Sequence, residues 1–133
     1  MSQLSNPPPP PARIGTWVLQ GIVAAAFFAA GSAKLAGADY MVELFNDIGV
    51  GQWFRYVTGT VEVAGALALV APGLIWLGGL GLGTTMIFAV LTHVYVLHTS
   101  PVPANVLGSL DALIVYLRRD EIASFARVLA RIL

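Results

Sequence analysis

The sequence contains no cysteine, which excludes disulfides, thiol redox relays, cysteine-ligated iron–sulfur clusters and cysteine-type zinc sites. Charged residues are also scarce: they make up 11% of the chain, against about 25% in a typical soluble domain. The seven basic and seven acidic residues cancel. This balance argues against nucleic acid as a partner, because nucleic-acid binding needs a clustered basic surface.

Apolar residues are what the chain has in abundance. Hydrophobic residues make up 57% of its 133 residues, and the mean hydropathy is +0.79. This composition is typical of a small integral membrane protein, and the length allows one domain. Each membrane-spanning helix needs about 20 apolar residues, so four spans leave no room for a separate soluble catalytic domain. The first partner that the sequence predicts is therefore the lipid bilayer.

Four apolar runs predict four transmembrane helices, at residues 14–33, 53–70, 74–97 and 102–117. Residues 71–73, Ala-Pro-Gly, form a tight turn between the second and third runs, and Pro101 and Pro103 break the chain before the fourth. Short connections of this kind place successive helices antiparallel. The fold class that we predict is an all-α, antiparallel four-transmembrane-helix bundle over residues 13–119, with both termini on one side.

Three further segments flank or interrupt these runs. Residues 1–12 contain five consecutive prolines and are predicted to be a disordered, proline-rich tail. Residues 37–52 are predicted to contain a short interfacial helix, capped by Asp39 and ended by Gly49, which is either a lid over the bundle or a plain surface helix. Residues 120–133 are predicted to form an amphipathic helix, which either lies on the membrane surface or continues the fourth helix into the cytoplasm.

Basic residues predict the orientation in the membrane. Only Lys34 and Arg55 lie on the side opposite the termini, whereas five arginines lie on the side of the termini: Arg13, Arg118, Arg119, Arg127 and Arg131. Cytoplasmic loops carry the excess of Lys and Arg. We therefore expect both termini in the cytoplasm, in a protein integral to the inner membrane of a bacterium.

Two acids bound a long uncharged stretch of the chain. No Asp, Glu, Lys or Arg occurs from Val63 to Leu110, and Glu62 and Asp111 stand at its two ends. A carboxylate among apolar residues is costly unless it is paired, protonated or hydrated, so acids within the membrane are candidate functional residues. At about 1.5 Å per residue, both acids lie about 13 Å from the outer ends of their helices. We expect them to share one level of the bundle.

If the polar faces of the helices converge, four ionisable side chains line one cavity in the outer half of the bundle: Lys34, Glu62, His93 and Asp111. Hydroxyl and amide groups at the same level would add hydrogen bonds: Thr58, Thr92, Tyr95 and Asn105. Because His93 and His98 are five residues apart, they do not share a helix face, and no metal site is predicted.

Each of these residues also has a structural interpretation. Lys34 either extends to the lipid headgroups or pairs with Glu62. Glu62 either makes an interhelical hydrogen bond or handles a ligand or a proton, and the same choice holds for Asp111, which could also be exposed to water. His93 is either an interfacial residue or a member of the site.

Short motifs carry a family resemblance: residues 30–35 (Ala-Gly-Ser-Ala-Lys-Leu), 59–67 (Gly-Thr-Val-Glu-Val-Ala-Gly-Ala-Leu) and 71–74 (Ala-Pro-Gly-Leu), with His93 late in the third run. They resemble the DoxX-like family of small four-helix membrane proteins, whose recurrent AGxxKL and GxxExxGxxxL patterns fall on Lys34 and Glu62. The resemblance covers residues 20–119. It implies a role in respiratory or oxidative-stress complexes.

The function that we expect is binding of a small lipophilic molecule, a quinone, in the outer-half cavity, as an accessory subunit of a redox complex. Lys34 and Glu62 would frame the ligand, and the acid–base residues would be Glu62, Asp111 and His93. No intrinsic cofactor is expected, because the chain lacks cysteine and evident cofactor ligands. Electron transfer would rest on the bound quinone or on a membrane redox partner, and a homo-oligomer is a further expected form.

Two alternatives stay open, so enzymatic activity is undecided at this point. The chain could be a cofactor-independent isomerase, lyase or hydrolase, in which one buried acid acts as general acid and its ionised partner as general base. It could also be a structural or assembly subunit, which requires the cavity to be packed shut by side chains.

Overall fold

The computed structural model describes residues 11–133, and within this range the chain forms helices and connections but no strand. The elements are α1 (Pro11–Ala36), α2 (Asp39–Ile48), α3 (Trp53–Leu69), α4 (Ile75–Thr92), the π-helical segment η1 (His93–Leu97), α5 (Val102–Leu117) and α6 (Arg119–Ile132). These bounds confirm the predicted all-α class and the predicted helical runs. Most of the predicted tail, residues 1–10, lies outside the described residues, and α1 already begins at Pro11.

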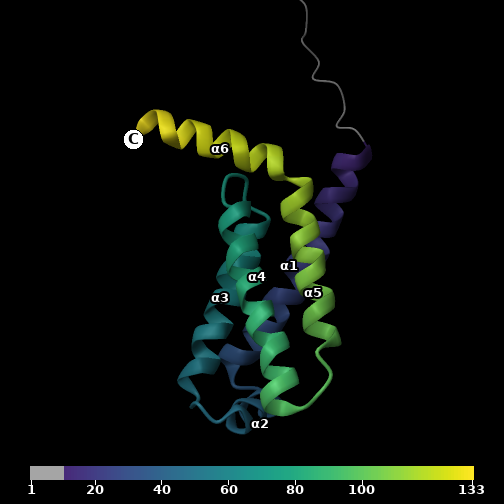
Figure 1. Cartoon of the computed structure of the whole chain (residues 1–133), viewed down its shortest axis with the longest axis vertical. Coiled ribbons are helices and arrows are strands. Elements are labelled where there is room, and N and C mark those ends of the chain that lie inside the picture. Colours follow the sequence, from purple (N-terminus) through teal and green to yellow (C-terminus); the bar gives the residue numbers. More distant parts are fainter. Residues whose placement is uncertain (1–10) are drawn as a thin grey trace, which may run out of the picture.

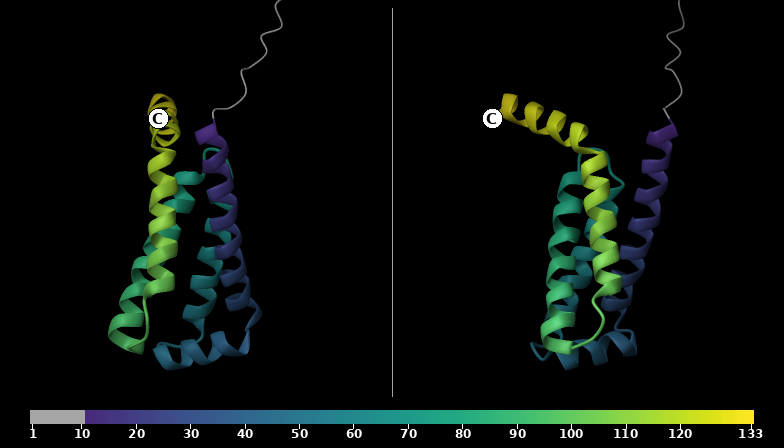
Figure 2. Two further views of the ribbon diagram at one scale, coloured as in Figure 1. Left: turned by 90° about the vertical axis from the view of Figure 1, so that its right-hand side faces the viewer. Right: turned by 45° about the vertical axis from the view of Figure 1, so that its right-hand side comes forward.

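Four long helices, α1, α3, α4 and α5, lie side by side (Figure 1). Helix α3 packs between α1 and α4, and α4 packs in turn against α5. Helix α2 lies across one end of the four long helices, and α6 lies across the other (Figure 2). The first turn of α1 and the C-terminus lie at the same end (Figure 1). We call the two ends the α2 end and the α6 end.

Glycines make the reversals that the sequence predicts. Gly73, with φ of 84°, sits in the turn between α3 and α4, and Gly49, also with φ of 84°, ends α2. This left-handed backbone favours glycine, because a Cβ would be strained there. Asp39 is the first residue of α2, and the N-cap position is occupied by Ala38, which has no capping side chain. The prediction that Asp39 caps this helix is therefore wrong. The Asp39 carboxylate lies in the first turn, where it complements the helix dipole.

In the described part of the chain, two helical segments are long and apolar enough to cross a membrane, Arg13–Ala36 and Ile75–Leu97. The apolar helix Val102–Leu117 is shorter, and α3 has 17 residues that include Arg55 and Glu62. All four long helices nevertheless point large apolar side chains outward, each more than half exposed: Ile22, Leu67, Leu80 and Val106. Outward apolar faces of this extent suit a hydrocarbon environment better than water.

Helix α6 turns away from α5 and does not continue it. Arg118 separates the two helices with φ of −101° and ψ of 9°, outside the helical range. Phe125 of α6 stacks on Trp76 of α4 at 6.3 Å between ring centroids, whereas Leu129 and Ile132 stay exposed. The predicted continuation of the fourth helix is therefore wrong, and the membrane-surface helix stays a prediction.

Candidate ligand-binding site

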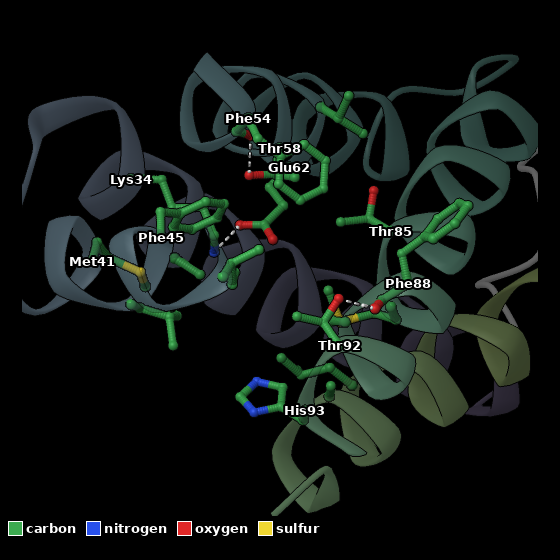
Figure 3. A pocket seen from close by; sticks show the side chains of 18 of the residues that line it. Lys34, Met41, Phe45, Phe54, Thr58, Glu62, Thr85, Phe88, Thr92 and His93 are labelled. Atoms are coloured by element: carbon green, nitrogen blue, oxygen red, sulfur yellow. Dashed lines mark hydrogen bonds and ion pairs between the residues drawn. The ribbon is translucent and has the colours of Figure 1, made fainter. Parts of the chain in front are cut away.

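The four long helices, α2 and η1 line a cavity of about 460 Å³ at the α2 end (Figure 3). Its wall is mostly apolar, with aromatic and methionine side chains such as Phe27, Met41, Phe45, Phe54 and Met86. Seven polar side chains interrupt this wall: Lys34, Thr58, Glu62, Thr84, Thr85, Thr92 and His93. An apolar cavity of this volume with a few polar groups is typical of small-molecule sites.

Lys34 and Glu62 form a buried ion pair in the cavity wall. Lys34 Nζ lies 2.9 Å from Glu62 Oε2, and the two side chains are 12% and 3% exposed. The pairing predicted for Lys34 is confirmed, and its extension to the headgroups is wrong. Within residues 11–133, the other carboxylate oxygen of Glu62, Oε1, makes no hydrogen bond. Figure 3 shows the carboxylate in the cavity, with Lys34 on one side and Thr85 of α4 on another.

Two glycines explain why these charges meet. A Cβ added at Gly31 would lie 2.8 Å from the backbone oxygen of Gly59, and one added at Gly59 would lie 3.0 Å from Lys34 Cβ. Helices α1 and α3 can approach this closely only because both positions lack a side chain. Lys34 and Glu62 each follow their glycine by three residues and so lie on the same helix face. The Gly-x-x-Lys and Gly-x-x-Glu motifs therefore act together: their glycines form the helix contact that brings the two charges within reach of each other.

Arg55 lies beside the contact between α1 and α3, at the α2 end, and is 5% exposed. Its Nη1 donates to the carbonyl oxygen of Lys34 and its Nε to Gln52 Oε1 at 2.6 Å. The guanidinium also lies 4.4 Å from the centroid of the Tyr56 ring. Arg55 therefore ties the last turn of α1 to the first turn of α3. The sequence identifies Arg55 only as an outer basic residue, since no motif marks its partners.

His93 lines the cavity from the first position of η1, on a different wall from Glu62 (Figure 3). Its Nδ1 lies 2.7 Å from Thr99 Oγ1, which leaves Nε2 available. This placement supports His93 as a member of the site. π-Helical turns are rare and occur often at functional sites. The sequence carries no signal for this one.

Asp111 does not line the cavity. It faces α4, where a Cβ added at Gly83 would lie 3.1 Å from Asp111 Oδ2. Asp111 is 2% exposed, and its Oδ1 is buried without a hydrogen-bond partner in the described part of the chain. The predicted convergence of four ionisable side chains is therefore wrong for Asp111, and so is its exposure to water. Tyr95 and Asn105 do not line the cavity either, whereas Thr58 and Thr92 do.

A second buried polar cluster, which no sequence motif indicates, lies at the α6 end. Arg118 is 4% exposed and donates from Nε to Gln20 Oε1 at 2.8 Å, while Gln20 Nε2 donates to the Leu69 carbonyl at 2.8 Å. Arg118 Nη1 also pairs with Glu121 at 2.7 Å, and the guanidinium lies 4.6 Å from the Trp17 ring centroid. This cluster joins α1, α3 and α6 around the end of α5.

The chemistry available in the cavity is therefore limited and specific. An apolar molecule fits the wall, a charged pair and an imidazole can exchange hydrogen bonds or protons with it, and the hydroxyl groups can accept hydrogen bonds. Within residues 11–133, no three His, Asp or Glu side chains come close enough together to hold a metal ion.

Over residues 11–133, the fold and the site define a helical protein with an apolar outer surface and a charged pair beside a partly open cavity. The chain belongs to the DoxX-like family, whose sequence profile matches residues 18–115. Family membership and the two long apolar helices together point to a membrane protein. The matched range includes Lys34, Glu62 and His93 but ends before Arg118. No curated protein and no solved structure matches the chain.

Proposed function

We propose that this DoxX-like protein binds a small lipophilic molecule, a quinone, in the cavity at the α2 end. The observation that carries the proposal is a largely apolar space of about 460 Å³ beside a buried Lys34–Glu62 pair. Burying two charges is costly, and a well-packed apolar pair would often be as stable. Because the Lys34–Glu62 pair lies at the edge of this open space, we infer that it binds a ligand.

We further propose that α1, α3, α4 and α5 all cross the membrane. With 17 and 16 residues, α3 and α5 extend about 25 Å, slightly less than the hydrocarbon core of about 30 Å. Local thinning of the bilayer accommodates a difference of this size. The excess of arginines at the α6 end supports cytoplasmic termini in a bacterial inner membrane. The cavity then lies in the outer half.

A quinone suits this cavity because its apolar body matches the apolar wall and its ring oxygens can accept a hydrogen bond from Lys34. The chain has no cysteine, so a bound quinone or a partner subunit would have to carry any electrons. This supports the function of an accessory subunit in a redox complex, with a redox protein or a second copy of the chain as partner.

A second candidate function is cofactor-independent catalysis on a lipophilic substrate. The observation that favours it is that Glu62 and His93 lie on two walls of one cavity, and that one Glu62 oxygen has no hydrogen-bond partner among the described residues. Such a pair can serve as general base and general acid. The open cavity argues against a purely structural subunit, for which we expect a closed interior.

Extraction of lipids from the purified protein, followed by mass spectrometry, tests the proposed binding. We expect a lipophilic molecule in near-stoichiometric amount from the unmodified protein, and about tenfold less from Glu62→Gln, because the charged partner of the site is lost. Glu43→Gln is the matched control, since Glu43 is exposed on α2. Equal recovery from all three proteins would contradict the proposal. A product formed from an added substrate, and lost in Glu62→Gln, would favour the enzyme.

A further inference from the structure

The threonine hydroxyl groups in the cavity wall already donate their hydrogens to backbone carbonyl oxygens. Each of the four threonines in the wall donates to the carbonyl oxygen four residues earlier: Thr58 to Phe54 at 2.9 Å, Thr84 to Leu80 at 2.8 Å, Thr85 to Gly81 at 2.8 Å and Thr92 to Phe88 at 2.7 Å. A hydroxyl that donates in this way keeps its oxygen lone pairs. The threonines therefore present only acceptors to a molecule in the cavity.

The ion pair adds one strong acceptor and a donor beside it. Glu62 Oε2 is taken by Lys34, but Oε1 has no partner within residues 11–133. An ammonium group has three hydrogens, and the Lys34 contact with Glu62 uses one of them. A ligand group at this position can therefore donate one hydrogen bond to Glu62 and accept another from Lys34.

We propose that the cavity selects lipophilic molecules with a free hydroxyl group, an alcohol or a phenol, over the matching ketone or ether. A hydroxyl is an uncharged group that both donates and accepts. A ketone or an ether only accepts, so it would cover Glu62 Oε1 without giving it a hydrogen bond, which is costly for a buried charged acceptor. A quinone meets this requirement only in its reduced, dihydroxy form. The inference rests on the proposed binding of a lipophilic ligand in this cavity.

A matched pair of probes tests the selection: a para-alkylphenol and its methyl ether. The two differ only in the hydroxyl hydrogen and a methyl group, and neither has the second ring oxygen that quinone–hydroquinone interconversion requires. Their binding is measured with the full chain in lipid nanodiscs, after subtraction of the uptake by empty nanodiscs. We expect the phenol to bind about tenfold more tightly, the value for a hydrogen bond to a charged group.

A double variant, Lys34→Met with Glu62→Leu, locates the preference. Replacing both members of a buried ion pair by apolar residues of similar volume often preserves stability, so the variant is expected to fold. It should bind phenol and ether equally. Thr60→Val is the matched control, because Thr60 lies on the exposed face of α3 and does not line the cavity. It should keep the tenfold preference.

The outcomes separate this inference from the proposed function. Equal binding of the two probes to the unmodified protein, or tighter binding of the ether, would overturn the selection while ligand binding stands. A preference for phenol that survives in the double variant would place the hydroxyl elsewhere and overturn it too. Binding of neither probe would count against both the ligand site and the selection.

Discussion

At the α6 end, Arg118 meets Gln20, Glu121 and the Trp17 ring, and the hollow nearby measures only about 20 Å³. At the α2 end, Lys34 and Glu62 bond to each other at the edge of about 460 Å³ of open space. Both ends bury charge within a chain that has little of it. Of these two ends, within residues 11–133, the α2 end is the one whose unpaired carboxylate oxygen, Glu62 Oε1, borders a space large enough for a ligand.

This difference shows that buried charge alone does not identify a ligand site. The charge at the α6 end links three helices through direct contacts, so its removal should affect stability. The charge at the α2 end is placed by a close helix contact and borders a cavity, so its removal should affect binding. Substitutions at the two ends should therefore separate these effects.

The largest loss of stability is expected from Arg118→Met. The change leaves the buried Gln20 amide oxygen without its donor and removes the contacts with Glu121 and Trp17. We expect the free energy of unfolding in mild detergent to fall by about 3 kcal/mol. Arg119→Met is the control, because Arg119 is exposed and should have little effect. A loss of ligand with unchanged stability would reverse the roles assigned to the two ends.

A smaller loss of stability, together with a loss of binding, is expected from Gly31→Ala. The added methyl group would lie 2.8 Å from a backbone oxygen of α3, which cannot move aside as a side chain could. We expect a loss of about 2 kcal/mol, and weaker ligand binding because α1 and α3 separate at the ion pair. Gly21→Ala, with no atom within 4 Å of the new methyl, should instead stabilise the helix by about 0.5 kcal/mol. Equal effects of the two changes would contradict the close contact.

The smallest effect on binding is expected from Asp111→Asn. Asp111 packs against α4 outside the cavity, so ligand recovery should stay within about twofold of the unmodified protein, a difference below about 0.5 kcal/mol. Lipid extraction of this variant beside Glu62→Gln measures the contrast. A loss as large as that of Glu62→Gln would mean that Asp111 acts on the ligand after all.

The sequence was sufficient to predict the helices, because long apolar runs and their turn residues are local signals. It was also sufficient to single out Lys34 and Glu62, since each stands in a glycine-containing motif within an apolar helix. The motifs alone do not show why the glycines recur. The close contact of Gly31 with Gly59 supplies that reason.

The other features of the site depend on contacts between distant parts of the chain, and such contacts produce no local sequence pattern. Depth along the helix placed Asp111 level with Glu62, but depth does not fix the helix face on which a side chain lies. Gln20 and Arg118 meet across 98 residues of sequence. The π-helical turn at His93 likewise has no known composition that would predict it.

Native mass spectrometry of the unmodified protein and of Ala89→Phe is the most direct test of ligand binding in the cavity. Ala89 lines the cavity, and a phenyl group there should fill space that a ligand needs. We predict a bound small molecule on the unmodified protein and none on Ala89→Phe, with both proteins folded. An unmodified protein without a bound molecule, or the same molecule retained by Ala89→Phe, would contradict the proposed binding in this cavity.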